Sequence, residues 1–245
     1  MERIALITGA GRGIGAATAH ELARRGYHVI VNYRGDERSA ASVVKRIEAA
    51  GGTARAVQAD VCDPVQVARL VDGCERVDAL VCNANIGPPF APLAEMTWED
   101  FAGKVTGELA AVFHVTRRVL GRMREQGGGR IVYVSSLSAE VVRTGAIAHA
   151  TAKAALNTFA QHVAAEAGAW GIAVNTVAPG AVRTEGSAAM RTPEVEAALA
   201  RRSVLGRMLD PEDVAAVIGT VLGGGLDALA GTRIPVDAGS RILPG

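Results

Sequence analysis

Three polar side chains in the middle of the chain, Ser136, His149 and Lys153, are of types that can hold and move protons. His149 and Lys153 lie four residues apart in a helical pattern, so both side chains face the same side of that helix. Histidine is a competent acid near neutral pH, but the positive charge of a neighbouring lysine favours the neutral imidazole. An exposed lysine is unexpected in so apolar a stretch, and we expect Lys153 to face a ligand. The Ser136 hydroxyl either hydrogen-bonds that ligand or caps a strand end, and we favour the first.

A glycine-rich turn near the start of the chain, Gly9-Ala10-Gly11-Arg12-Gly13-Ile14-Gly15, follows a short apolar run and opens a helical pattern. Gly9 can adopt backbone angles that are closed to other residues, and Gly13 and Gly15 let a ligand approach the backbone closely. The first turn of the helix offers unpaired N–H groups and a partial positive charge, which suit a pyrophosphate. A tight turn without a ligand would use similar residues, but the order strand, turn, helix favours a phosphate site.

Composition bounds the class of protein. The 245 residues are 49% apolar, and 26 Lys and Arg balance 25 Asp and Glu, so there is no basic field for nucleic acid. Aromatic residues make up 4% of the chain, which argues against a stacking surface for single strands. No run approaches the ~20 apolar residues that span a bilayer. The cysteines, Cys62, Cys74 and Cys82, lack metal-ligand spacing and indicate reduced thiols in a cytoplasmic protein without a metal site.

Apolar strand-like runs alternate with helical patterns along the whole chain, which predicts a parallel sheet covered by helices on both faces. The predicted strands span 4–8, 28–33, 54–59, 79–82, 130–135, 173–178 and 232–236. The predicted helices span 13–25, 37–50, 64–74, 98–126, 147–167 and 211–222, with Thr97 and Pro211 as start signals. Because no repeat or linker interrupts this alternation, we expect one α/β domain over residues 1–245, a Rossmann-like doubly wound fold with about seven strands.

Two segments are predicted to be loops over a site. Residues 86–94 contain Pro88, Pro89 and Pro92, and the segment from Arg183 onward carries small, polar and charged residues. Both leave the carboxyl ends of predicted strands, where ligands bind in open parallel sheets. We expect a substrate-binding lid around 183–205; a mobile surface helix is the alternative, and the segment can be both.

The motifs, in this order and spacing, resemble those of the short-chain dehydrogenases/reductases over essentially the whole chain. The matching segments are the glycine turn, Asp60-Val61, Asn83-Ala84, Ser135-Ser136, Lys153, and Asn175-Thr176-Val177-Ala178-Pro179-Gly180 followed by Thr184. The resemblance implies that Ser136, His149 and Lys153 occupy the catalytic positions. It assigns binding of a nicotinamide dinucleotide to Gly9, Gly13, Ile14, Gly15, Asp60, Val61, Asn83, Ala84, Lys153, Pro179, Gly180, Val182 and Thr184.

The residues after the second predicted strand indicate which dinucleotide is bound. An acidic side chain there would accept from a ribose 2′-hydroxyl and repel a 2′-phosphate. The chain instead has Asn32-Tyr33-Arg34, with no carboxylate before Asp36. Arg34 and Arg12 can both pair with a phosphate, so we predict NADP(H) over NAD(H), with reduction as the working direction. A solvated surface charge is the alternative for Arg34 alone.

Three departures from the family pattern fall at central positions. His149 stands where the family has its catalytic tyrosine, Glu108 where it has a helix asparagine, and Asn85 where it has a glycine. The resemblance implies a mechanism in which the tyrosine protonates the oxygen after hydride transfer and the asparagine holds a relay water. Without the tyrosine and the asparagine, that proton relay cannot operate in this chain. We expect Glu108 to pair with a neighbouring arginine, which in one alternative belongs to another subunit.

Four accounts of the missing tyrosine stay open. His149 itself donates the proton; or the substrate brings its own acid, such as a phenol beside the carbonyl; or Ser136 and a water suffice for slow reduction; or the chain binds NADP(H) without chemistry. We favour the second, because hydride delivery coupled to a proton shift within the substrate needs the protein only to orient the reactants.

A narrower resemblance, to reductases that tailor aromatic polyketides, agrees with that account. The sequence therefore predicts an NADPH-dependent ketoreductase acting on a bulky, phenolic ketone. A 3-oxoacyl-type reductase that uses His149 as its acid, or a regulator that binds NADP(H) without turnover, is the alternative. The expected partners are a small-molecule ketone and further copies of the chain, in a dimer or tetramer, with neither nucleic acid nor membrane. The helices predicted over 98–126 and 147–167 resemble those that form the family's subunit contacts.

Overall fold

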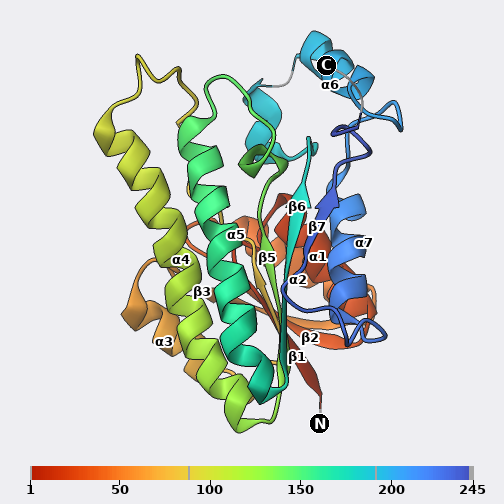
Figure 1. Ribbon diagram of the computed structural model, residues 1–245. Helices are drawn as coiled ribbons and strands as arrows, with labels where there is room; N and C mark the ends of the chain where they lie inside the picture. Colours follow the sequence, from red (N-terminus) through yellow and green to blue (C-terminus); the bar gives the residue numbers. More distant parts are fainter. Residues whose placement is uncertain (1, 88, 191, 243–245) are drawn as a thin grey trace.

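The computed structural model describes residues 2–87, 89–190 and 192–242, except for the side chains at 187, 189 and 190. In these residues seven parallel strands form one sheet in the order β3-β2-β1-β4-β5-β6-β7 (Figure 1). The strands are β1 (Arg3–Ile7), β2 (Tyr27–Tyr33), β3 (Thr53–Gln58), β4 (Ala79–Cys82), β5 (Gly129–Val134), β6 (Ile172–Pro179) and β7 (Arg233–Val236). The predicted α/β fold with about seven parallel strands is confirmed.

Helices cover both faces of the sheet, as Figure 1 shows. One face carries α3 (Pro64–Asp72), α4 (Trp98–Glu125) and α5 (Ile147–Ala167). The other carries α1 (Gly13–Arg24), α2 (Glu37–Ala49) and α7 (Pro211–Leu222). Short 3-10 turns lie at η1 (Leu137–Ala139), η2 (Gly168–Trp170) and η3 (Glu185–Met190), and α6 (Pro193–Arg201) stands above the strand ends.

Alternating apolar side chains explain the two cores. In β1, Leu6 points into the core beneath α3, α4 and α5, whereas Ala5 and Ile7 point into the core beneath α1, α2 and α7. All three side chains are fully buried. A strand that buries both faces reads as a continuous apolar run, which is the pattern that the sequence showed.

The helix start signals act as predicted. The Thr97 hydroxyl accepts from the backbone N–H of Asp100 at 3.1 Å, and Pro211 occupies the first turn of α7. Within the segment predicted as a lid, residues 193–201 form the helix α6, so the segment contains the surface helix that was given as the alternative. Thr192 caps it and Pro193 opens it, so the signals for this helix were present in the sequence.

The three cysteines are free, and Cys74 and Cys82 are buried in the core. Within the described residues, no group of three or more His, Cys, Asp or Glu side chains has an arrangement suited to a metal ion. No helix in the described part of the chain has the length and apolarity needed to cross a membrane.

The sheet order places the site. The chain runs outward from β1 to β3 and then returns to β4 on the other side of β1, so connections diverge at the carboxyl ends of β1 and β4. Such a switch point leaves a crevice between the diverging loops. Pro88, within one of the two predicted loops, lies outside the described residues.

Candidate active site

A cleft of about 660 Å³ opens at the carboxyl ends of the strands. The three predicted catalytic residues, Ser136, His149 and Lys153, all line it. The predicted cofactor-binding residues that also line it are Gly9, Arg12, Gly13, Ile14, Arg34, Asp60, Val61, Asn83, Ala84, Pro179, Gly180, Val182 and Thr184. Gly15 is buried behind the turn. The structure thus brings these residues to one cleft, and their contacts with a cofactor stay a prediction.

The glycine turn is shaped by close backbone approach. Gly9 has φ +61°, and a Cβ there would lie 2.9 Å from the Cα of Ala84. A Cβ at Gly15 would lie 2.5 Å from both Gly9 O and the Nδ2 of Asn83. The Asn83 amide donates to the carbonyls of Thr8 and Gly9 at 3.0 Å, which ties the turn to the end of β4. The cradle therefore fits the phosphates of a dinucleotide, which need close access to backbone N–H groups.

A carboxylate that the sequence did not reveal lies at this turn. The backbone N–H of Gly13, at the start of α1, donates to Glu185 Oε2 at 3.1 Å. The start of a helix attracts anions, and Glu185 takes the place that a phosphate oxygen would take. A pyrophosphate bound at the same N–H requires this side chain to move aside.

The end of β2 offers positive charge to the cleft. Asn32 turns its side chain inward, where Oδ1 accepts from Gly9 N at 3.3 Å and Nδ2 donates to Ala59 O at 3.0 Å. The Asp36 carboxylate caps α2 by accepting from the N–H and hydroxyl of Ser39 at 3.0 and 2.7 Å. Arg12 and Arg34 line this part of the cleft, so guanidinium groups are available to a phosphate.

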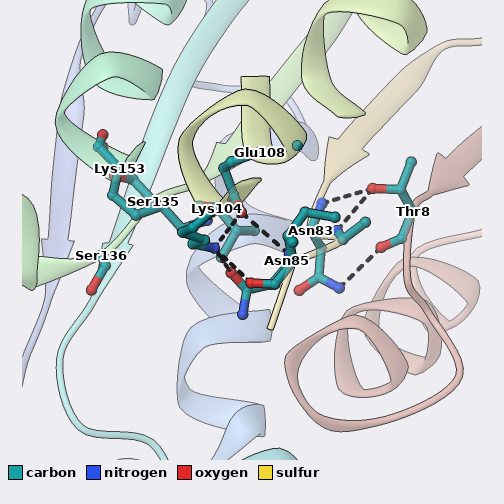
Figure 2. A network of polar contacts seen from close by, with 12 residues as sticks. Thr8, Asn83, Asn85, Lys104, Glu108, Ser135, Ser136 and Lys153 are labelled. Carbon is teal, nitrogen blue, oxygen red and sulfur yellow. Dashed lines mark hydrogen bonds and ion pairs between the residues drawn. The ribbon is translucent and has the colours of Figure 1, made fainter. Parts of the chain in front are cut away.

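A buried charged network lies under the other end of the cleft (Figure 2). Glu108, on α4, accepts from the Lys153 ammonium at 2.6 Å through Oε1 and from the Lys104 ammonium at 2.5 Å through Oε2. The three side chains are between 0% and 5% exposed. The prediction that Glu108 pairs with an arginine is wrong, because both partners are lysines of the same chain.

Lys104 is the functional candidate that the sequence analysis missed. Its ammonium also donates to Asn85 Oδ1 at 2.8 Å and to Ile86 O at 2.7 Å. Asn85 therefore joins the network that contains Glu108; the sequence analysis interpreted both residues as departures from the family pattern. The four-residue spacing of Lys104 and Glu108 was the available signal, since such pairs face each other on a helix.

The network carries one excess positive charge when both lysines are protonated. Burial raises the pKa of Glu108, but the charges and hydrogen bonds of Lys153 and Lys104 outweigh it, and the pKa lies below its ordinary value. Burial lowers the pKa of Lys104, against the opposing charge of Glu108. Paired in this way, the buried carboxylate stays ionised.

His149 is held neutral. Burial and then the positive charges of Lys153 and Lys104 lower its pKa to about 4. Its ring lies 6.1 Å from that of Phe90, and its buried Nδ1 has no hydrogen-bond partner within the described residues. A group with this pKa holds almost no ionisable proton at neutral pH, so His149 is a poor acid.

Ser136 keeps its hydroxyl proton for a ligand. Its Oγ accepts from the backbone N–H of Ser138 at 3.1 Å, and the side chain lines the cleft. A hydroxyl that accepts there can still donate one hydrogen bond. A side cavity of about 140 Å³ adjoins the cleft, and Ser136, Ser138 and Arg143 line both.

Comparisons with known proteins agree with this arrangement. Residues 3–195 match the family model described as short chain dehydrogenase. Versicolorin reductase 1 of Aspergillus parasiticus is 37% identical, over 97% of this chain and 96% of that protein. Hydroxynaphthalene reductase arp2 of Aspergillus fumigatus is also 37% identical, over 88% of this chain and 84% of that protein. The crystal structure of a gluconate 5-dehydrogenase from Burkholderia cenocepacia, in complex with NADP and tartrate, has a TM-score of 0.91 at 30% identity, over 99% and 96% of the two chains.

The chain therefore belongs to the short-chain dehydrogenase family. It is an NADP-dependent oxidoreductase of that family.

Proposed function

We propose that the protein is an NADPH-dependent ketoreductase that transfers a hydride to the carbonyl of a bulky, phenolic ketone, with the substrate supplying the proton. The observation that carries the proposal is His149 on the cleft wall: its buried Nδ1 has no hydrogen-bond partner within the described residues, and burial with the nearby lysine charges lowers its pKa to about 4. The names of two relatives, a versicolorin reductase and a hydroxynaphthalene reductase, support an aromatic substrate. Within the family we place the protein among reductases of aromatic polyketide tailoring, such as the angucyclinone ketoreductase of the simocyclinone pathway.

The cofactor half of the proposal rests on the turn and the arginines. The glycine turn gives phosphates access to the backbone at the start of α1, and Arg12 and Arg34 offer guanidinium groups for a 2′-phosphate. NADPH, when bound, supplies the hydride. The NADP complex of the gluconate 5-dehydrogenase, which shares the fold at 30% identity, supports this choice.

The protein's own residues orient the ketone and stabilise charge. The Ser136 hydroxyl has a hydrogen to donate to the carbonyl oxygen. The phenolic O–H of the substrate breaks as an O–H bond forms at the reduced carbonyl, which leaves a phenolate for water to reprotonate. The excess positive charge of the network, with Arg143 on the cleft wall, stabilises that phenolate.

The surroundings of the site suit a large substrate. Phe90, Leu199 and Met208 add apolar surface to the cleft, and the side cavity extends it below α6. Residues 183–205 include η3 and α6 and would act as the lid. We further propose that the protein is cytoplasmic and assembles into a dimer or tetramer through α4 and α5. Phe113 on α4 is 45% exposed in the single chain, which supports such a contact.

NADPH oxidation with a matched pair of aromatic ketones tests the proposal. One ketone carries a hydroxyl beside the carbonyl, and the other carries the same group as its methyl ether. We expect turnover of the phenol and a rate at least about 100-fold lower for the ether, because a general acid contributes roughly that factor or more. Equal rates would contradict the substrate as proton donor. Reduction of simple acyl-thioester ketones without reduction of the phenol would contradict the substrate class.

A further inference from the structure

We propose that Lys104 is a positioning residue: acting through Glu108, it fixes Lys153 so that one N–H of the Lys153 ammonium faces the cofactor. The inference rests on the proposed binding of NADPH. Lys104 is fully buried and is not among the residues that line the cleft, whereas Lys153 lines it. Lys104 therefore does not contact a ligand in the cleft, and the positioning effect proposed here passes through the groups that it holds.

The Lys104 ammonium donates one more hydrogen bond within the protein than the Lys153 ammonium does. An ammonium has three N–H donors. Lys104 uses three, on Glu108 Oε2, Asn85 Oδ1 and Ile86 O. Lys153 uses two, on Glu108 Oε1 and on Val134 O at 2.8 Å. One donor of Lys153 is left for a ligand in the cleft, and none of Lys104 is.

Lys104 determines which oxygen of the Glu108 carboxylate is available to Lys153. Its ammonium and the N–H of Ile86, at 3.3 Å, both occupy Oε2, so only Oε1 is presented to Lys153. Without Lys104 the carboxylate would be free to turn both oxygens toward Lys153 and to accept its remaining donor, because charge-assisted bonds of this kind are strong. That would withdraw the donor from the cleft.

The same ammonium also anchors the wall of the cleft. Asn85 and Ile86, which follow β4, line the cleft, and Lys104 holds both. Asn85 and Glu108 are thus acceptors on two sides of one buried cation. This accounts for Asn85 and Glu108 together. Buried N–H donors need acceptors, and the Asn85 amide oxygen and the Glu108 carboxylate each accept from the Lys104 ammonium.

A double-mutant cycle on NADPH affinity tests the inference, with the dissociation constant measured by fluorescence titration. The proteins are wild type, Lys104→Met, Lys153→Met and the double variant, each shown to be folded by circular dichroism. We expect Lys104→Met to raise the NADPH Kd about tenfold when Lys153 is present and less than about twofold when it is absent. Arg118→Met is the matched control, since Arg118 lies on the same helix as Lys104 and forms an exposed ion pair with Asp72 of α3, and it should change the Kd less than about twofold.

The outcomes separate this inference from the proposed function. A wild type that binds no NADPH overturns both. A wild type that binds NADPH, with the same effect of Lys104→Met in both backgrounds or no effect in either, overturns the inference alone. Should Lys104→Met fail to fold, the cycle is repeated with Lys104→Gln, whose amide keeps two donors for the buried acceptors. That variant should raise the Kd at least about threefold only when Lys153 is present, and any other result overturns the inference.

Discussion

The two ends of the cleft are built in opposite ways. At the β1–α1 turn, backbone N–H groups and rim arginines face the open cleft, and the shape depends on glycines without side chains. At the α4–α5 end, the polar groups are side-chain charges that are almost completely buried. The first end carries the predicted glycine pattern, and the second contains Asn85, Glu108 and His149, the three residues that the sequence analysis interpreted as departures from the family pattern.

This difference indicates that binding the cofactor and protonating the product are separable tasks. The turn tolerates little change, because a Cβ at Gly15 would collide with the backbone. The buried end can be rebuilt as long as every charge finds a partner, which the network of Lys104, Glu108 and Lys153 achieves. The following experiments probe each end, from the largest expected effect to the smallest.

Glu108→Gln should have the largest effect on stability. It leaves two buried ammonium groups without their shared carboxylate, and breaking a buried pair in this way costs about 3–5 kcal/mol. Asp72→Asn makes the same chemical change in the exposed pair with Arg118 and should cost less than about 1 kcal/mol. Urea unfolding at pH 7 measures both, and equal losses would mean that the buried network does not hold this end together.

The pH dependence of stability should report His149. Its pKa is about 4 in the folded protein and 6.5 in the reference state, so the unfolded chain binds the proton more readily. The stability linked to the neutral ring is complete above pH 6.5 and is lost as the pH falls to about 4, a change of about 3 kcal/mol.

His149→Phe should remove that part of the pH dependence in urea unfolding at pH 7, 5.5 and 4. His162→Phe, on the exposed side of the same helix, should leave it unchanged. A His149→Phe protein that loses as much stability as wild type over this interval would show that the partly buried imidazole is not the group responsible.

Gly15→Ala should disrupt the glycine turn at the β1–α1 end of the cleft. The added methyl would lie 2.5 Å from Gly9 O and Asn83 Nδ2, so the turn must shift, which costs about 1–3 kcal/mol and abolishes tight NADPH binding. Gly121→Ala is the matched control, because a Cβ in that part of α4 meets nothing within 4 Å. It should leave NADPH affinity unchanged and add about 0.5–1 kcal/mol of stability. Unchanged NADPH affinity in Gly15→Ala would contradict the assignment of the turn.

Arg34→Ala should have the smallest effect, and a selective one. Loss of a guanidinium that pairs with the 2′-phosphate should raise the NADPH Kd about tenfold and leave the NADH Kd within about twofold. Arg38→Ala, exposed on α2 and outside the cleft lining, should change neither. Parallel weakening of both cofactors by Arg34→Ala would remove the basis for NADPH preference.

How far the sequence predicts this molecule depends on the range of the interactions. The seven strands and six of the helices follow from periodicity and caps, which are local properties, and the glycine turn is likewise a local pattern. Of the two partners of Glu108, Lys104 lies four residues away and its spacing was a local signal, whereas Lys153 lies 45 residues away and meets Glu108 only when α5 packs beside α4. Glu185 at the Gly13 N–H, 172 residues away, carries no local signal either. The pKa of His149 depends on the same long-range packing.

The central claim is that the proton comes from the substrate and not from His149. The direct test is the rate of NADPH oxidation by wild type and His149→Phe, each with the phenolic ketone, with NADPH binding checked in both. The account predicts that the variant keeps at least about a third of the wild-type rate, because the replaced ring is neutral and donates no proton. A loss of about 100-fold or more, with NADPH binding intact, would make His149 the acid and contradict the account.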